Sequence, residues 1–192
     1  MNIAEDKKRC EWCEKDDLYR AYHDNEWGEI VRDERLLFEF IVLEMMQAGL
    51  SWHTILKKRE AMRVAFDDFK PEILAKYDEG KISELLQTEG IIKNRLKLNA
   101  LSANAKAFLS IQSEFGSFFD YIWSFTNGVR IKNNLNEISQ IPARSELSDQ
   151  ISKDMKKRGF KFLGSVTVYS FLQAIGVIND HLSYCFKAKD NL

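Results

Sequence analysis

The sequence has few residues that interrupt helices and no long apolar run. Only two of its 192 residues are proline and nine are glycine, so long helices are favoured. No uninterrupted apolar stretch approaches the roughly 18 residues of a membrane-spanning helix. The first residues, MNIAEDKKRC, lack the apolar segment of a secretory signal. We therefore expect a helical protein without a membrane span or a secretory leader.

Cysteine and net charge are also scarce. The three cysteines, an odd number, argue against a disulfide framework and favour a reducing compartment. They are too few for an iron–sulfur cluster with four cysteine ligands. The net charge of −1 provides no overall attraction to nucleic acid, so any DNA binding must depend on local basic patches.

The remaining composition is ordinary for a soluble globular protein, with 45% hydrophobic and 30% charged residues. A chain of 192 residues is long enough to bury about 70% of its unfolded surface in one domain. No stretch alternates as a strand does, so we predict an all-α domain over residues 1–192. Its parts are an N-terminal arm (1–28), a helical body (29–178) and a C-terminal segment (179–192).

Periodicity, caps and stop signals predict the helices of the body. We expect them over residues 33–49, 51–66, 71–77, 81–87, 94–111, 115–125, 148–159 and 164–179. Ser148 is the expected N-cap of the seventh helix. Residues 126–146 are polar and contain several turn signals, so they are predicted to form an irregular surface segment.

The helix over 33–49 carries one residue that breaks its apolar pattern. Glu44 lies seven residues after Leu37 and four after Phe40, which places it on the apolar face. A buried carboxylate costs several kcal/mol unless it is paired or used. One interpretation is a structural glutamate bound to an arginine or to backbone donors. The other is a functional carboxylate in a dry, aromatic-walled pocket, which the many nearby aromatic residues favour.

The aromatic residues of the arm support the second interpretation. Residues 10–28 combine Trp12, Tyr19, Tyr22 and Trp27 with acidic residues and show no helical periodicity. They predict an ordered cap, because a free tail would not contain so many aromatic residues. Trp12 is interpreted as an anchor of the arm. Tyr22 and Trp27 are interpreted as part of a pocket.

A short turn between two predicted helices is a candidate phosphate-binding site. Gly90 forms the turn, and Lys93, Arg95 and Lys97 lie at the start of the helix that follows. Backbone N–H groups at such a turn favour an anion, and nearby cations reinforce them. Many helical hairpins without this function share the pattern.

The two ends of the chain hold a candidate metal site. His181 and Cys185 are four residues apart, so one helical turn can present both to an ion. The arm offers Cys10, Cys13 and His23. Four such ligands suit Zn²⁺ and leave no open position for a reactive water, which predicts a structural role. Spacing alone does not show whether Cys13 or His23 is the fourth ligand. It is also compatible with cysteines and histidines that bind no common ion.

Several motifs together resemble the DNA-3-methyladenine glycosylase I family of bacterial base-excision repair enzymes. They are YHDNEWG at 22–28, LEMMQAGLSW at 43–52, WSF at 123–125, KKRGFKFLGSVTVYSFLQAIGVINDH at 156–181, and His181-x-x-x-Cys185. The resemblance runs from about residue 10 to residue 185. It implies a two-lobed helix-hairpin-helix glycosylase fold that flips 3-methyladenine out of double-stranded DNA and hydrolyses its glycosidic bond. It also implies a bacterial cytoplasmic protein, which we expect to be a monomer.

The resemblance further implies roles for individual residues. Glu44 is implied to be the catalytic carboxylate that contacts the extruded base. The implied base-binding residues are Tyr22, Trp27 and Trp52, with Tyr19 and Trp12 nearby; the implied DNA-binding residues are Gly90, Ile91, Lys93 and Arg95. One structural Zn²⁺ per chain is implied to be held by Cys10, His23, His181 and Cys185.

This chain departs from the family pattern in places. Met45 stands where a small residue is usual, Cys13 is additional, and the hairpin lacks the two-glycine form of the wider superfamily. Asp120 is not in the context of a catalytic aspartate, so we predict a monofunctional enzyme that leaves an abasic site. Two alternatives remain: a non-catalytic, zinc-stapled nucleic-acid-binding module, and a broader glycosylase that also releases 7-methylguanine.

Overall fold

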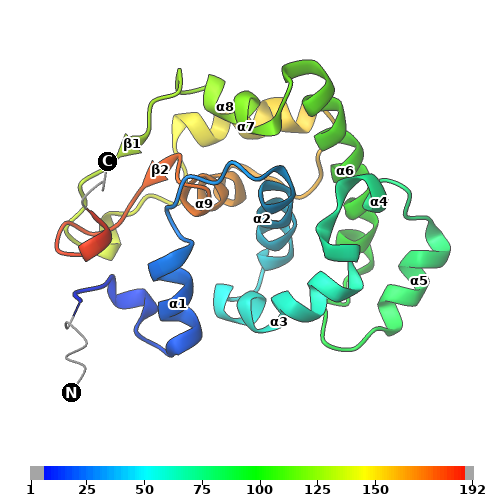
Figure 1. Ribbon diagram of the computed structural model, residues 1–192, viewed down its shortest axis with the longest axis horizontal. Helices are drawn as coiled ribbons and strands as arrows, with labels where there is room; N and C mark the ends of the chain where they lie inside the picture. The colour runs from blue at the N-terminus through cyan, green and yellow to red at the C-terminus, as the bar shows by residue number, and fades with distance from the viewer. Residues whose placement is uncertain (1–6, 189–192) are drawn as a thin grey trace.

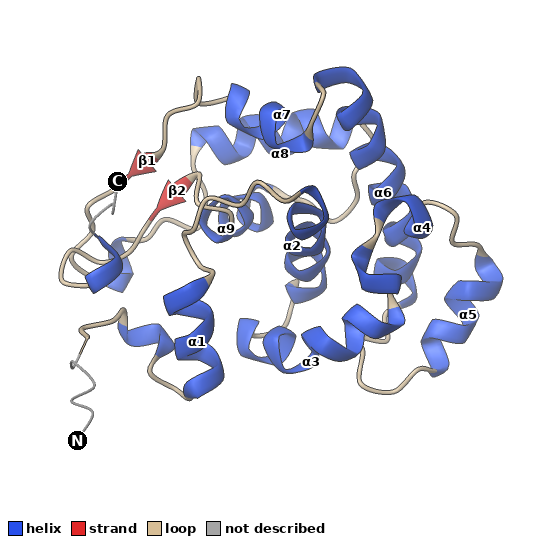
Figure 2. Cartoon of the chain, in the orientation of Figure 1, coloured by secondary structure: helices blue, strands red, loops and turns tan. Residues whose placement is uncertain are grey.

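The computed structural model describes residues 7–188. The outer ends of the predicted arm (1–6) and C-terminal segment (189–192) lie outside the described residues. Most of the described chain is helical, as predicted, with one pair of two-residue strands (Figure 2). The α-helices are α1 Asp17–Asn25, α2 Glu34–Gln47, α3 Trp52–Ala65, α4 Pro71–Leu74, α5 Glu79–Gln87, α6 Arg95–Phe115, α7 Phe118–Ser124, α8 Glu146–Lys157 and α9 Ser165–Ala174. The 3-10 turns are η1 Glu11–Cys13, η2 Asp67–Phe69, η3 Ile138–Gln140 and η4 Phe186–Ala188.

Helix α2 is the centre of the molecule. It packs against α3, α6, α7 and α9, which surround it in Figure 1. Every side chain from Leu37 to Met46 is buried. The predicted burial of Glu44 is therefore confirmed. Its burial does not depend on lying on one apolar face, because α2 has no solvent-exposed face over this stretch.

Local side-chain caps begin the helices near the functional residues. Asp33, Ser51 and Asn94 each accept a hydrogen bond from the backbone N–H three residues later, at 2.7, 3.2 and 3.1 Å. These are the predicted starts of α2, α3 and α6. Gly49 adopts φ +83°, a left-handed conformation that turns the chain from the end of α2 toward α3.

The N-terminal arm and the start of α8 differ from the sequence prediction. The arm does contain regular structure: Asp16 caps α1 by accepting from the backbone of Tyr19 at 3.0 Å. Helix α8 is capped by Ser145, and Ser148 is the third residue inside it. Each of these serines accepts from the backbone N–H of the other, so the predicted cap is the reciprocal partner of the true one.

The last helix is shorter than predicted and is followed by a strand. Helix α9 ends at Ala174, and Gly176 turns the chain with φ +79°. A Cβ on Gly176 would lie 2.5 Å from the carbonyl oxygen of Glu29, so only glycine fits. Strand β2 (Ile178–Asn179) then pairs in parallel with β1 (Ile131–Lys132), which lies in the segment predicted to be irregular. Two residues are too few for strand periodicity to be visible.

The two ends of the described chain lie together beside α1. The N–H of Phe186 donates to the carbonyl of Lys8 at 2.9 Å, and Figure 1 places the blue and red ends on the same side of the molecule. This arrangement brings η1, α1 and the segment before η4 into contact. Among the described residues, no helix has both the length and the apolar character needed to cross a membrane.

Candidate functional site

Glu44 lines a cavity of about 240 Å³, here called the Glu44 cavity. Its wall combines side chains from the arm, α1, α2, α3, the η3 region and α9. The lining residues are Trp12, Tyr19, Tyr22, Trp27, Glu44, Gln47, Trp52, Ile138, Ile141, Ser170 and Gln173. All five aromatic residues implied by the resemblance are thus brought together around the carboxylate.

The aromatic rings contact one another as well as the cavity. The ring centroids of Tyr22 and Trp52 are 5.3 Å apart and the planes are tilted by 52°. Trp12 makes edge-on contacts with Tyr19 at 5.2 Å and with Trp27 at 5.0 Å. Trp12 therefore anchors the arm, as interpreted from the sequence, and lines the cavity too. Such mutual packing holds the rings in place before any ligand arrives.

Glu44 is buried without a compensating charge. It is 4% exposed, and its Oε2 has no hydrogen-bond partner within residues 7–188. No ion pair to Glu44 is found in the same part of the chain. Burial raises the pKa of this carboxyl to about 8. The structural interpretation, a glutamate bound to arginine, does not apply to this residue.

That interpretation applies instead to Glu39, which the sequence did not single out. Glu39 is fully buried on the same helix and accepts from Arg35 at 2.7 Å, Arg59 at 2.6 Å and Arg63 at 2.7 Å. Burial opposes its ionisation, but the arginines outweigh burial and hold the pKa of Glu39 below its usual value.

Polar residues of the Glu44 cavity were also missed from the sequence. Gln47 is three residues after Glu44 on α2, so helical spacing alone could have suggested it. Ser170 and Gln173 share one face of α9 by the same spacing. The Nε2 group of Gln173 donates to Asp180 at 2.7 Å, which fixes its amide. Ile138 and Ile141 come from the surface segment, and no local pattern placed them here.

A second cavity of about 190 Å³ adjoins the first and shares Glu44, Gln47 and Ser170 with it. The turn after α2 and the start of α9 form its other walls; these residues are Ala48, Gly49, Leu50, Val166 and Thr167. Met45 lines neither cavity. It is fully buried, with its sulfur 3.3 Å from Nδ2 of Asn104, so its departure from the family pattern does not alter the cavity wall directly.

Lys97 has a different place from the one expected. It was grouped with the cations of the phosphate-binding turn, but its side chain is buried. Its ammonium donates to the carbonyls of Met46 at 2.9 Å and Ala48 at 2.7 Å, at the C-terminal end of α2. A cation at this end favours the helix dipole. Burial lowers the pKa of Lys97.

Of the other implied DNA-binding residues, Gly90, Lys93 and Arg95 lie at the surface, whereas Ile91 is buried. Lys93 pairs with Glu89 at 2.8 Å, and Arg95 pairs with Glu79. Ile91 is 4% exposed, so only its backbone can reach a ligand. Gly90 adopts φ +84°, and a Cβ there would lie 2.9 Å from that of Ala61.

The turn also leaves backbone donors free. Within residues 7–188, the N–H groups of Ile91, Ile92 and Lys93 make no hydrogen bond. The carbonyl of Gly90 accepts from Lys58 on α3 at 3.1 Å, which fixes the turn. A fixed turn with free N–H groups and surface cations has the features of an anion site.

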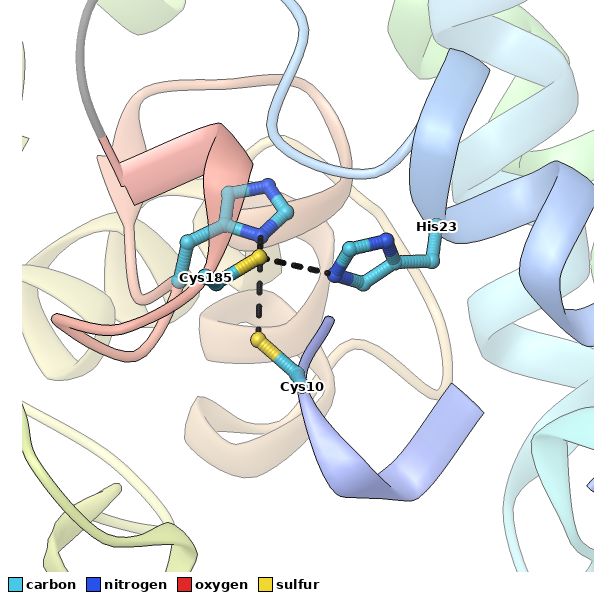
Figure 3. Close-up of side chains that lie close together, drawn as sticks. Cys10, His23 and Cys185 are labelled. Carbon is cyan, nitrogen blue, oxygen red and sulfur yellow. Dashed lines mark hydrogen bonds between the residues drawn. The ribbon is translucent and has the colours of Figure 1, made fainter. Parts of the chain in front are cut away.

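The four implied metal ligands lie together. One ligand atom each from Cys10, His23, His181 and Cys185 is within 4.8 Å of the others, and all four residues are buried. Figure 3 shows the sulfurs of Cys10 and Cys185 and the ring of His23 converging on one point. The Cys185 sulfur lies 3.4 Å from His23 Nε2 and 3.6 Å from His181 Nδ1, and the Cys10 sulfur lies 3.8 Å from His181 Nδ1.

These separations fit a tetrahedral ion. Bonds of about 2.3 Å to sulfur and 2.0–2.1 Å to nitrogen place neighbouring sulfur and nitrogen atoms roughly 3.5 Å apart. The outer ring nitrogens are also occupied: His23 Nδ1 meets Asp24 at 2.8 Å, and His181 Nε2 meets the carbonyl of Trp27 at 3.1 Å. These contacts orient both rings so that their other nitrogens face the cluster.

Cys13 is outside the cluster. Its sulfur donates to the carbonyl of Cys10 at 3.1 Å, and burial raises the pKa of the Cys13 thiol to about 12. The hydrogen bond from Cys10, followed by those of the two histidines, lowers the pKa of Cys185. The geometry therefore selects His23 and not Cys13 as the fourth member, and the cluster could hold a metal ion.

Comparison with known proteins gives one consistent result. The family model described as methyladenine glycosylase matches residues 12–188. DNA-3-methyladenine glycosylase 1 of Escherichia coli is 46% identical over 178 residues, which cover 93% of this chain and 95% of that protein. DNA-3-methyladenine glycosylase of Haemophilus influenzae is 45% identical over 177 residues, with 92% and 96% covered.

Solved structures agree with the sequence comparisons. 3-Methyladenine DNA glycosylase I from Staphylococcus aureus, solved to explain 3-methyladenine recognition, is 40% identical and superposes with a TM-score of 0.92 over 96% of this chain and 98% of that one. A variant 3-methyladenine DNA glycosylase I in complex with 3-methyladenine is 40% identical, with a TM-score of 0.91 and 94% and 97% covered.

Proposed function

The chain belongs to the methyladenine glycosylase family, and we propose that its Glu44 cavity receives the base that the enzyme excises. The protein is a DNA glycosylase of base-excision repair that removes 3-methyladenine by hydrolysing its N-glycosidic bond. One observation carries the assignment of the site: a buried carboxylate without a partner faces a cavity walled by aromatic rings.

The substrate's own chemistry explains this wall. Adenine methylated at N3 is a cation in DNA, so its glycosidic bond is already weakened. Water adds a hydroxyl group to C1′, the bonding electron pair leaves with N9, and the base departs neutral while one proton passes to solvent. Little general-acid assistance is needed, and the protein's main tasks are selection and positioning. Stacking of the cation on Tyr22 and Trp52 contributes about 0.5–2 kcal/mol per ring.

Glu44 adds selection by charge. Its raised pKa leaves a substantial protonated fraction near neutral pH in the empty cavity. A cationic base entering the cavity favours the ionised carboxylate, because opposite charges attract strongly in a dry site. Neutral adenine lacks this attraction. Glu44 would also accept hydrogen bonds from the exocyclic amine, so it is the residue that contacts the reacting base.

The aromatic and polar lining supports a monofunctional reaction. The residues that line the Glu44 cavity include no lysine, so no amine is available there to attack C1′ and cleave the strand. Asp120 is exposed on α7, where its carboxylate accepts a hydrogen bond from Ser117 at 2.7 Å. It lines neither the Glu44 cavity nor the second cavity. The product would be an abasic site in an intact strand.

The proposed fold is the two-lobed helix-hairpin-helix arrangement, with residues 88–94 as its phosphate-binding turn. The free N–H groups of Ile91 and Lys93 would meet a phosphate, and Gly90 permits the close approach. Lys93 and Arg95 would exchange their carboxylate partners for phosphates. The exchange costs little, since exposed ion pairs contribute about 0–1 kcal/mol. Extrusion of the base costs a few kcal/mol, least for a damaged base.

The metal proposed for the buried cluster is a structural Zn²⁺. Two thiolates and two imidazoles are a donor set that zinc prefers, and four protein ligands close the coordination sphere. When bound, the ion would join η1 and α1 to the C-terminal segment. The cluster contacts Trp27 through His181, so it would hold one wall of the Glu44 cavity in place.

We expect a monomer that binds alkylated double-stranded DNA in a reducing bacterial cytoplasm. The odd number of cysteines in the sequence supports this expectation of a reducing compartment.

Release of free base from methylated duplex DNA tests the assignment. Wild type should release 3-methyladenine. Glu44→Gln keeps the shape of the side chain but removes its charge, so it should stay folded and release the base at least 100-fold more slowly. A non-catalytic binding module would release no base, and chromatography of the same reaction would reveal 7-methylguanine from a broader enzyme. Unchanged release by Glu44→Gln would exclude Glu44 from the mechanism.

A further inference from the structure

Phe162 is an exposed aromatic residue held in an unfavourable backbone conformation. It adopts φ +59°, in the left-handed region that bulky residues rarely occupy, and its side chain is 43% exposed. Its ring stacks on no other aromatic ring of the described chain, unlike nearby Phe160, which packs on Phe118. Folding alone gives no reason to place an aromatic ring here. Such strain often marks a functional position.

A fully buried side chain maintains this conformation. Oδ1 of Asn104 accepts from the N–H of Lys161 at 2.7 Å, and Nδ2 donates to the Lys161 carbonyl at 3.2 Å. These bonds fix the backbone directly before Phe162. The same Nδ2 lies 3.3 Å from the sulfur of Met45, the neighbour of Glu44. Asn104 on α6 therefore ties the Phe162 segment to the central helix that carries the catalytic residue.

The segment leads directly to the edge of the cavities. Leu163 is buried and its carbonyl accepts from Ser152 at 2.7 Å, which anchors the other side of Phe162. Val166 and Thr167, three and four residues after Leu163, line the second cavity together with Leu50. Phe162 and Lys161 are thus exposed four and five residues before Val166, in the segment that leads to a cavity sharing Glu44, Gln47 and Ser170 with the Glu44 cavity.

We propose that Phe162 contacts the duplex beside the extruded nucleotide, packing its ring on the neighbouring base or sugar. The proposal rests on the proposed function. A base inside the Glu44 cavity stays attached to its strand, so the flanking nucleotides must cross the rim of the cavities. Extrusion exposes the faces of the bases next to the gap, and an aromatic ring can cover such a face. Lys161, exposed next to the ring, provides a cation for the adjoining phosphate.

The backbone strain gives this proposal a distinctive test. In Phe162→Gly the ring is lost, but glycine accepts φ +59° without strain, so its melting temperature should equal or exceed that of wild type. Its kcat/KM on methylated duplex should fall about 5- to 100-fold, the range for losing one stacking contact. Phe162→Leu should retain part of the activity. Ile30→Ala, at a similarly exposed apolar residue (44%), should behave like wild type.

Binding of free 3-methyladenine separates a DNA contact from damage to the cavity. Phe162→Gly should bind the free base as wild type does. A variant with wild-type kcat/KM would overturn the proposal, and so would one that loses affinity for the free base, because the ring would then act through the cavity. Failure of the wild type to release 3-methyladenine from duplex DNA would instead overturn the proposed function.

Discussion

Glu39 and Glu44 lie five residues apart on α2, both buried, and are held in opposite electrostatic states. Glu39 meets three arginines within 2.7 Å, and its pKa is lowered. Glu44 meets none, and burial raises its pKa to about 8. The carboxylate of Glu39 joins α2 to α3. The carboxylate of Glu44 makes no ion pair in the described chain, so it can form one with a ligand. Equal burial therefore has different consequences according to what faces each side chain.

The unpaired state of Glu44 should make wild-type stability fall as the pH rises. In the unfolded chain this carboxyl titrates near its ordinary value, about 4.3, whereas in the folded protein it titrates near 8. Between these values the folded state binds more protons, so the free energy of unfolding decreases with pH. The total effect is about 5 kcal/mol at most, from 1.4 kcal/mol per unit. Urea unfolding of wild type and Glu44→Gln at pH 5, 7 and 8.5 measures it.

The expected difference has a definite sign. Glu44→Gln should match wild-type stability most closely at pH 5, and it should exceed wild-type stability by an increasing margin as the pH rises. Glu39→Gln is the matched control on the same helix. It leaves three arginines without their shared carboxylate, so it should lose about 3 kcal/mol at neutral pH. A stability gap between Glu44→Gln and wild type that does not change with pH would contradict the assignment of the raised pKa.

The sequence made Glu44 recognisable because a carboxylate interrupted an apolar helix. Its distinction from Glu39 was not predictable by the same means. The partners of Glu39 include Arg59 and Arg63, which come from α3, and the hydrophobic pattern of one helix contains no information about the charges on the next. Resemblance identified the catalytic candidate, but only the packing of α2 against α3 explains why Glu39 is not one.

Local signals were sufficient where local contacts decide the structure. The caps at Asp33, Ser51 and Asn94 involve residues three apart; the sequence predicted Asp33 and Ser51 as caps and Asn94 as the start of a helix. Ser145 and Ser148 are reciprocal partners, so either could be read as the cap. Lys97 looked like a surface cation in sequence, and its burial against α2 depends on tertiary packing. The cavity residues Ile138 and Ile141 likewise depend on how a distant segment folds over the site.

Loss of one ligand of the Cys10–His23–His181–Cys185 cluster should lower both the metal content and the stability of the protein. Cys185→Ser replaces a thiolate with a weak metal ligand, so metal content should fall and the melting temperature should drop by 10 °C or so, as for a loss of about 3–4 kcal/mol. Base release below the melting temperature should persist, because the contact of His181 with the carbonyl of Trp27 does not involve Cys185. Cys13→Ser is the matched control, because Cys13 is a buried cysteine next to the cluster that is not one of its four members. The Cys13→Ser protein should keep one metal ion per chain.

Metal analysis and thermal melting of the two cysteine variants decide this prediction. A Cys185→Ser protein with wild-type stability and no bound metal would refute the role assigned to the cluster. Equal loss of metal in Cys13→Ser would show that the cluster has a different ligand set.

Lys97 should affect both stability and catalysis. In Lys97→Met the apolar stem remains, but the carbonyls of Met46 and Ala48 lose their donor, which should cost about 2–3 kcal/mol. The turn from Ala48 to Leu50 would shift at the edge of the second cavity. Since misplacement of a binding element lowers rates, kcat should fall about 10-fold or more. Lys106→Met, at an exposed position on α6, should change neither quantity.

The turn between α5 and α6 should determine the salt dependence of DNA binding. If Lys93 and Arg95 replace Glu89 and Glu79 by phosphates, each alanine substitution removes one ionic contact. The slope of log K against log salt should then become shallower by about 1 for each variant. Arg144→Ala is the matched control, since Arg144 is an exposed arginine paired with Asp149 at 3.3 Å outside this turn.

Glu89→Ala should have the opposite effect, because it releases Lys93 from a competing carboxylate, so affinity for undamaged duplex should rise. Fluorescence anisotropy over 50–200 mM salt measures all four, and equal slopes in Lys93→Ala, Arg95→Ala and wild type would remove this turn from the DNA interface.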